Sequence, residues 1–199
     1  MIYQGQEQHL KGSGTPLNRQ ALWLSGYNTD SVLYKLIGKL NAIRRHAQVI
    51  DNNYVNIPSR AVFEGGSELA LIKGTEGLQV LLLLSNQGSS GKPYKLILPY
   101  SFNAGTDITE VLSCKNYTSN NQGEVQLDMD AGEPRVLFPT KYMHGSGLCG
   151  YPSANVTLAG LKTGQQYATS QGKHARQIPA FTFSLPMALL VGLSIGKLF

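Results

Sequence analysis

The feature that most constrains the fold is a change of periodicity at Pro58. After this residue, short apolar runs alternate with glycine-rich turns about every ten residues, a spacing typical of antiparallel β-sandwiches. Crossover helices of the kind that join parallel strands have no counterpart in this pattern. We expect seven strands, at residues 61–64, 68–73, 79–84, 94–98, 108–113, 124–129 and 134–138.

One of these runs differs from the others because its apolar residues are continuous. Residues 80–84 read Val-Leu-Leu-Leu-Leu, so both faces of the strand are apolar. In a sheet with one face in solvent, a strand alternates apolar and polar side chains. A strand that is buried on both faces does not. We therefore place this run in the centre of a sheet.

The residues before Pro58 predict a different structure. Residues 1–4 favour a short strand, and a glycine-rich loop follows at residues 12–16. The stretch from residue 30 to residue 47 predicts a helix that is N-capped within residues 28–31. Its apolar positions recur at helical spacing: Leu33, Leu36, Ile37, Leu40, Ile43 and Ala47. A strand, a helix and then a sandwich is the order expected where the end of one domain precedes the whole of another.

The predicted helix has two further features. Arg44, Arg45 and His46 fall in its expected last turn, where positive charge complements the helix dipole. Its apolar face would lose its partners if the preceding domain were missing. We therefore expect this helix to expose a large apolar surface.

Composition and charge exclude several classes of protein. With 199 residues and 42% hydrophobic content, the chain can bury a sizeable core and is not disordered. The formal charge is +5, but the basic residues are scattered and only Arg44 and Arg45 are adjacent. Without a basic stripe to follow a phosphate backbone, we predict no nucleic-acid partner.

Two cysteines, Cys114 and Cys149, are compatible with one disulfide or with two buried thiols. Neither lies in a Cys-x-x-Cys pair or near histidine at ligand spacing. We therefore predict no zinc site.

The C-terminal sequence has the layout of a glycosylphosphatidylinositol attachment signal. Residues 178–199 are almost entirely apolar, and a polar stretch with small residues precedes them. Ala168 and Ser170 are the candidate attachment residues. A plain membrane anchor is the alternative interpretation, although Pro186 weakens this segment as a continuous helix.

Several longer motifs resemble one family. Residues 2–9 are similar to the eighth barrel strand of the fungal α-amylases, members of glycoside hydrolase family 13 with a (β/α)8 catalytic barrel. The resemblance continues to Cys149 through these motifs: Trp23-Leu24-Ser25-Gly26-Tyr27, Thr29-Asp30-Ser31, Leu33-Tyr34-Lys35-Leu36-Ile37, Lys73-Gly74-Thr75, Leu84-Ser85-Asn86, Leu112-Ser113-Cys114 and Pro134-Arg135-Val136-Leu137-Phe138-Pro139-Thr140. It implies a mainly β fold, in which a Greek-key β-sandwich follows the last strand and helix of the barrel. One branch of the family carries a glycosylphosphatidylinositol anchor, which the C-terminus here resembles.

This resemblance implies four segments. Residues 1–57 would be the barrel remnant, 58–149 the C-terminal sandwich domain, 150–177 a polar spacer and 178–199 the tail. The family's chemistry is retaining hydrolysis, or transglycosylation, of α-1,4-glucosidic bonds in starch or cell-wall α-glucan. Such chemistry needs two carboxylates, which the family takes from barrel strands four, five and seven. We therefore expect the chain as given to be inactive by itself. The family's calcium ligands also lie upstream, so we expect no cofactor in this chain.

The resemblance also assigns site residues. The arginine at position 19 helps to bind a distal glucose unit in the family, together with an aspartate where this chain has Thr15. Trp23 is either a sugar platform or a packing residue, and Glu7 and His9 would form a hydrogen-bonded pair. The spacing of Cys114 and Cys149 matches that of the family's disulfide.

The expected partners are an α-glucan or maltooligosaccharide and, through the C-terminal anchor, a membrane. Asn116 and Asn155 begin N-glycosylation sequons, which fit a location at the cell surface. The alternative function is a non-catalytic glucan-binding or interaction module at that surface.

Overall fold

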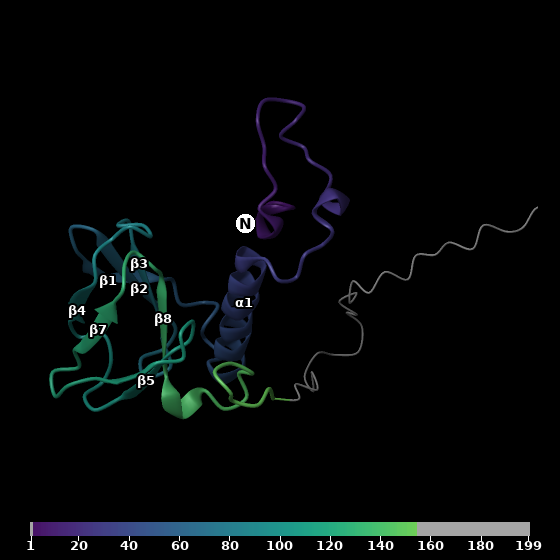
Figure 1. Ribbon diagram of the computed structural model, residues 1–199. Helices are drawn as coiled ribbons and strands as arrows, with labels where there is room; N and C mark the ends of the chain where they lie inside the picture. The colour runs from purple at the N-terminus through teal and green to yellow at the C-terminus, as the bar shows by residue number, and fades with distance from the viewer. Residues whose placement is uncertain (1, 155–199) are drawn as a thin grey trace, which may run out of the picture. The chain divides into compact units, whose positions relative to one another are not determined.

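A computed structural model describes residues 2–154 (Figure 1). Asn155, Ala168, Ser170 and the apolar tail at 178–199 lie outside the described residues. The described chain contains helix α1 (Val32–Ile50) and the short 3-10 helices η1 (Gln6–Gln8), η2 (Leu22–Ser25) and η3 (Thr140–Tyr142). Its strands are β1 (Arg60–Glu64), β2 (Glu68–Lys73), β3 (Val80–Ser85), β4 (Tyr94–Leu98), β5 (Asp107–Glu110), β6 (Asn116–Thr118), β7 (Val125–Met129) and β8 (Arg135–Pro139).

The strands form two antiparallel sheets, as the turn spacing predicts. One sheet has the order β1-β2-β3-β8-β5-β6, and the other pairs β4 with β7. Strand β8 lies between β3 and β5 although it is last in the sequence, which is the type of non-sequential pairing that Greek-key connections produce. The predicted mainly β fold is therefore confirmed.

The predicted strand at 108–113 ends early, and a further short strand follows it. Strand β5 stops at Glu110 because the carboxylate of this residue accepts hydrogen bonds from Leu112 N (3.0 Å) and Ser113 N (2.6 Å). These two bonds divert the backbone into a turn that returns as β6. With only three residues, β6 has no recognisable period in the sequence.

The main core lies between the two sheets. Residues of β4 and β7 alternate between exposed and buried positions, as expected for strands with one solvated face. Buried residues from both sheets, together with Phe102 from the loop after β4, form one cluster: Ala70, Ile72, Leu81, Leu83, Leu96, Leu98, Phe102, Ile108, Val125, Leu127, Met129 and Leu137.

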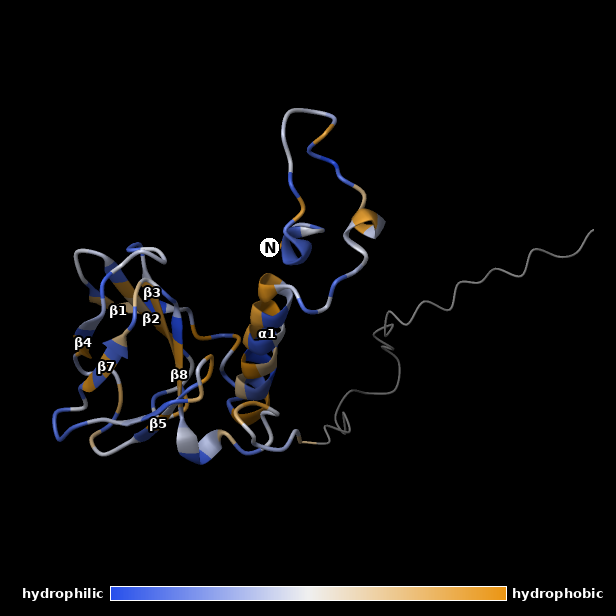
Figure 2. Cartoon of the chain, viewed as in Figure 1, coloured by the Kyte–Doolittle hydropathy of each residue, from blue (hydrophilic) through white to orange (hydrophobic). Residues whose placement is uncertain are grey.

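A second core covers the opposite face of the larger sheet. Strand β3 lies between β2 and β8, which confirms its predicted central position. Leu81 and Leu83 face the main core, whereas Val80 and Leu82 pack against a cluster that includes Ile43 of α1. Figure 2 shows apolar residues both on the strands and along α1. The continuous apolar run of β3 therefore reflects two cores, one on each face.

Helix α1 begins two residues later than the sequence predicts and continues three residues further. The Ser31 hydroxyl caps it by accepting a hydrogen bond from Tyr34 N at 3.2 Å. Because the helix runs to Ile50, Arg44, Arg45 and His46 lie inside it, and their predicted position in the last turn is wrong.

The two halves of α1 have different environments. In the C-terminal half, Ile43, His46 and Ala47 are buried, so the large exposed apolar surface that the sequence predicts does not include this half. In the N-terminal half, Leu33, Leu36 and Ile37 are only half-buried and Val32 is 74% exposed. The apolar face of α1 is thus partly exposed in its N-terminal half, and its C-terminal half packs against the sheet.

Residues 2–4, the described part of the predicted strand at residues 1–4, are not in a strand. Gln6 N donates to Tyr3 O at 3.2 Å, and Tyr3 N donates to the Gln6 side chain at 2.7 Å. These bonds close a turn that leads into η1. A strand needs neighbouring strands to bond its backbone, and in residues 2–154 no strand pairs with this segment.

Candidate functional site

Side-chain hydrogen bonds tie the N-terminal segment to the start of α1. The Ser31 hydroxyl donates to Glu7 O while it caps the helix. Gln8 Nε2 donates to Asn28 O at 3.1 Å. The two ends of the segment are therefore close together, and residues 10–27 form a loop between them.

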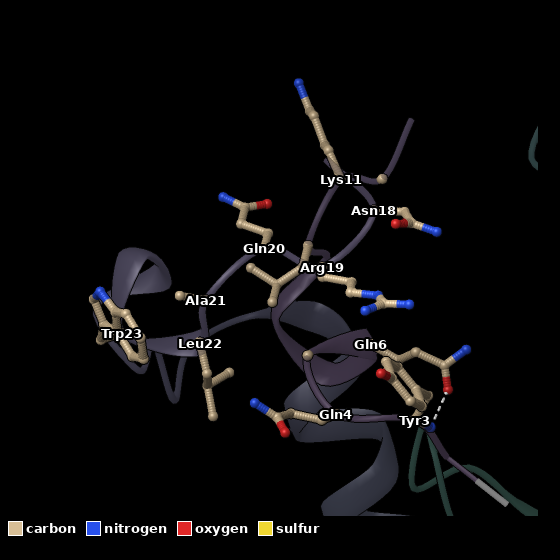
Figure 3. A pocket seen from close by; sticks show the side chains of 13 residues that line it. Tyr3, Gln4, Gln6, Lys11, Asn18, Arg19, Gln20, Ala21, Leu22 and Trp23 are labelled. Carbon is tan, nitrogen blue, oxygen red and sulfur yellow. Dashed lines mark hydrogen bonds between the residues drawn. The ribbon is translucent and has the colours of Figure 1, made fainter. Parts of the chain in front are cut away.

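This loop surrounds a hollow of about 400 Å³, shown in Figure 3. Turn hydrogen bonds shape its wall, including one from Arg19 N to Pro16 O at 3.1 Å and one from Gly26 N to Trp23 O at 3.2 Å. Four amide side chains line it: Gln4, Gln6, Asn18 and Gln20. Side-chain amides both donate and accept hydrogen bonds, so they suit a ligand that is rich in hydroxyl groups.

The structure brings both predicted substrate-binding residues, Arg19 and Trp23, to this hollow. Figure 3 shows Arg19 extending on the side of Tyr3 and Gln6, whereas Trp23 lies on the opposite side, on η2. The Trp23 side chain is 69% exposed, so it is not a core packing residue in the described chain. Thr15, which stands where the family has an aspartate, is exposed and does not line the hollow.

The hollow has binding groups but no carboxylate, because none of its lining residues is Asp or Glu. Nearby, the Glu7 carboxylate accepts a hydrogen bond from Gly5 N at 3.1 Å. No hydrogen bond joins Glu7 to His9 in the described residues, so the expected pair is wrong. His9 adopts a left-handed backbone with φ of 53° at the end of η1. The arrangement can bind hydroxyl groups, but it lacks the two carboxylates of a double displacement.

A cluster of buried charged groups lies elsewhere, in the sandwich. Glu110 is fully buried, and one of its carboxylate oxygens lies 3.9 Å from Arg135 Nη1. Arg135 also donates to Asp130 Oδ2 at 3.1 Å. Because Glu110 also accepts three backbone hydrogen bonds, from residues 112, 113 and 136, its carboxylate organises a turn.

Two of the ionisable groups outside the hollow, Tyr94 and Asp51, have pKa values that are shifted for identifiable reasons. Burial raises the pKa of Tyr94, and so does the hydrogen bond that its hydroxyl donates to Glu68 at 2.8 Å. Burial alone would raise the pKa of Asp51, but hydrogen bonds from Thr75 and Asn53 outweigh it and hold the pKa below its ordinary value. Neither group lines the hollow around Arg19.

The expected disulfide between Cys114 and Cys149 is confirmed, and it closes a loop with a sequence separation of 35. Both cysteines have positive φ, 61° and 51°, a backbone conformation that few residues other than glycine adopt. Cys114 N donates to Glu110 O at 2.7 Å. The disulfide therefore joins the turn after β5 to the last described segment of the chain.

Neither a metal site nor a membrane span was found in the described part of the chain. In residues 2–154, histidine, cysteine and acidic side chains form no group of three that could hold a metal ion. Helix α1 and the shorter helices do not combine the length and hydropathy of a bilayer-spanning helix.

The fold is an antiparallel β-sandwich of two sheets that follows helix α1, and the hollow lies in the segment before this helix. Residues 61–157 match the family model described as "Alpha-amylase, domain C". The sandwich is therefore similar to this domain, and the relatives with which the chain also aligns are α-amylases.

Relatives extend the similarity beyond the sandwich. The chain is 37% identical to Alpha-amylase 1 of Schwanniomyces occidentalis over 149 residues, which is 75% of this chain and 29% of that protein. It is 38% identical to the α-amylase of Saccharomycopsis fibuligera over 149 residues, 75% of this chain and 28% of that protein. The α-amylase structure from Malbranchea cinnamomea aligns with a TM-score of 0.68 and 39% identity, over 73% of this chain and 30% of that one. The chain thus spans less than a third of the length of these relatives.

Proposed function

We propose that residues 2–154 are the C-terminal part of an α-amylase-like enzyme that hydrolyses, or transglycosylates, α-1,4-glucosidic bonds in starch or cell-wall α-glucan. The observation that carries the proposal is the similarity to α-amylases over 149 residues. This stretch is longer than the matched domain C and includes residues outside it. The substrate class would be an α-glucan or a maltooligosaccharide.

In this proposal the chain contributes binding and stability, and a preceding part of the enzyme contributes the catalytic carboxylates. The hollow around Arg19 and Trp23 would contact a distal sugar unit, since it offers a guanidinium, an exposed indole and four amides. The half-exposed apolar residues of α1, from Leu33 to Ile37, would pack against the rest of the barrel. Residues 2–154 alone would not hydrolyse starch.

A chimera tests the proposal directly. The portion of the Malbranchea cinnamomea enzyme that aligns with this chain would be replaced by residues 2–154. We expect the chimera to hydrolyse soluble starch and a chromogenic maltooligosaccharide, and residues 2–154 alone to release nothing above a buffer blank. A folded chimera without activity would contradict the proposal.

Variants of the chimera separate substrate binding from folding. Losing one hydrogen-bonding group from a sugar site costs about 0.5–1.5 kcal/mol, or 1.5–3 kcal/mol if the group is charged. Arg19→Ala should therefore raise KM for short maltooligosaccharides by about tenfold. Arg45→Ala is the matched control, because Arg45 is an exposed arginine of α1 that does not line the hollow. Equal KM values for the two variants would remove Arg19 from the proposed sugar site.

The hollow also supports a second candidate function, a non-catalytic glucan-binding module at the cell surface. Arg19, Trp23 and the amides lie together in this chain without help from any other domain. Isothermal titration of residues 2–154 with maltoheptaose distinguishes the two functions. Binding without hydrolysis, together with an inactive chimera, would favour the module.

We also propose attachment to the cell surface through a glycosylphosphatidylinositol anchor at Ala168 or Ser170. The proposal rests on the order of small residues, polar spacer and apolar tail in the sequence. With a secretion signal fused in front, the protein should be released from membranes by a phosphatidylinositol-specific phospholipase. A protein that stays membrane-bound and keeps an epitope placed after Phe199 would instead have a plain membrane anchor.

A further inference from the structure

A second, smaller hollow of about 200 Å³ lies beside the disulfide, where the edge of the larger sheet meets the last described loop. Its volume is below the roughly 300–1,000 Å³ of sites that enclose a drug-sized ligand. It therefore suits a single ring held against a wall better than a fully enclosed free ligand. Its lining residues are Thr109, Cys114, Asn116, Cys149, Gly150 and Tyr151.

Asn116, one of these lining residues, is held in a fixed orientation by a buried threonine. Its Oδ1 accepts a hydrogen bond from Thr109 Oγ1 at 3.1 Å. Thr109 is only 1% exposed, and its hydroxyl also contacts Thr140 Oγ1 at 2.9 Å. Asn116 itself is exposed, and its Nδ2 meets no hydrogen-bond acceptor among the described residues. The nitrogen is therefore accessible while the oxygen is fixed.

Asn116 begins the sequon Asn-Tyr-Thr, whose acceptor atom is the asparagine Nδ2. We propose that Asn116 carries an N-linked glycan and that its first N-acetylglucosamine lies in this hollow against Tyr151. The proposal rests on the secretory route that the proposed function requires. It adds a specific binding position for the first sugar, which a sequon alone does not provide.

Tyr151 provides the wall for the sugar. It is half-buried, packs against the second core, and is the one aromatic side chain among the six lining residues. The C–H face of a sugar ring packs on an aromatic face, which carries partial negative charge. Gly150, with φ of 81° and no atom within 4 Å of where a Cβ would lie, leaves the approach to this wall open.

The modification is a group transfer from a lipid-diphosphate oligosaccharide, the ordinary donor in the secretory pathway. A bond forms between Asn116 Nδ2 and the anomeric carbon of the first N-acetylglucosamine. The bond from that carbon to the diphosphate oxygen breaks, and the amide proton leaves with the lipid diphosphate. The product retains one N–H on Nδ2 and keeps Oδ1 free to accept from Thr109.

The glycan would also cover an exposed strand edge. Strand β6 is at the end of the six-stranded sheet and pairs only with β5. An uncovered edge presents unpaired backbone groups that can pair with another chain. A glycan that leaves the sheet at the first residue of β6 would block such pairing.

The full chain, secreted from yeast behind a signal peptide and with Asn155→Gln to remove the second sequon, tests the proposal. Peptide mass spectrometry should find Asn116 occupied. Endoglycosidase H leaves one N-acetylglucosamine on the asparagine. The glycopeptide amidase removes every sugar and converts the asparagine to aspartate, a change that is the same in every variant compared below. We expect the trimmed protein to keep the Tm of the untreated protein, and the sugar-free protein to melt about 2–4 °C lower.

Variants of Tyr151 test whether the first sugar packs against this side chain. In Tyr151→Phe the difference in Tm between the trimmed and sugar-free forms should remain, and in Tyr151→Ala it should vanish. Because each variant is compared with itself, a general loss of stability does not affect the result. If Tyr151→Ala does not fold, the N-acetyl methyl proton signal in the NMR spectrum of the trimmed wild type tests the contact instead. A methyl group that lies against an aromatic ring gives a signal shifted upfield.

Three results would overturn the proposal: an unmodified Asn116 in folded secreted protein, equal Tm for the trimmed and sugar-free forms, or an unshifted methyl signal. Each of these is independent of the amylase activity of the chimera. A failure here therefore leaves the proposed enzymatic function intact, and an inactive chimera does not affect the glycan result.

Discussion

Asp51 joins the end of helix α1 to the turn between β2 and β3, so its removal tests how firmly the helix is held to the sandwich. The residue is 5% exposed. Its Oδ2 accepts a hydrogen bond from Thr75 N at 2.7 Å, and its Oδ1 accepts from Asn53 N at 2.9 Å and from Thr75 Oγ1 at 3.0 Å. Its own backbone N–H donates to Ala47 O at 2.9 Å.

Two substitutions remove these contacts to different degrees. Asp51→Ala leaves the N–H groups of Asn53 and Thr75 without their acceptor. A hydrogen bond to a charged group contributes about 1.5–3 kcal/mol, and bonds to one carboxylate are not additive, so we expect a loss of about 2–4 kcal/mol. For a chain of this size such a loss lowers Tm by about 4–16 °C. Asp51→Asn keeps one acceptor oxygen and should lose roughly half as much.

The pH dependence provides a second test of the same contacts. The hydrogen bonds from Thr75 and Asn53 hold the pKa of Asp51 below its ordinary value of 3.8 despite burial. The stabilisation is therefore fully present above the ordinary value and is lost as the pH falls through the lower pKa of the folded state. The difference in Tm between wild type and Asp51→Asn should shrink as the pH falls below about 4.

Thermal melts followed by circular dichroism, from about pH 7 to about pH 2, measure both effects. Asp30→Asn is the matched control, because the Asp30 side chain is 83% exposed and forms only a surface ion pair with Lys35 at 3.0 Å. Such pairs contribute at most about 1 kcal/mol. The reasoning fails if Asp51→Ala has the same Tm as the wild type at neutral pH. It also fails if the difference between wild type and Asp51→Asn is the same at both ends of the pH range.

Two further predictions concern the same domain. Replacing Cys114 and Cys149 by alanine should lower the free energy of unfolding by about 3–4 kcal/mol in the chain-entropy model, measured by urea titration; an unchanged midpoint would contradict it. A chain that begins at Pro58 loses the half of α1 that covers Val80 and Leu82, so we expect it to melt lower and bind more hydrophobic dye than a chain that begins at Lys39. Identical melting of these two truncated chains would show that α1 does not stabilise the sheet.

The sequence predicts the strands of this fold well because turn residues and apolar periodicity act locally. It predicts their ends less well because single side chains decide them. Strand β5 stops where the Glu110 carboxylate accepts hydrogen bonds from the backbone N–H groups of Leu112 and Ser113. No periodic signal in the sequence marks these hydrogen bonds.

The hollow around Arg19 was predictable only in part. The resemblance to the α-amylases singled out Arg19 and Trp23, and the structure brings both to one hollow. The amides that share it include Gln4 and Gln6, to which the resemblance assigned no binding role. They come together through the turn that replaces the expected strand at residues 1–4. A local pattern favoured extended backbone there, and the described chain offers no neighbouring strand to stabilise it.

Helix α1 shows that the apolar face of one helix can be only partly buried by the sheet beside it. Its apolar positions form a continuous stripe, but only Ile43 and Ala47 are buried against the outer face of the larger sheet. Leu33, Leu36 and Ile37, which lie nearer the start of the helix, remain half-exposed in the described part of the chain. A helix that is half covered by its own sandwich has the packing expected of an element shared by two domains. The C-terminal half of α1 holds the sandwich, and the N-terminal half is the surface on which the proposed catalytic barrel would pack.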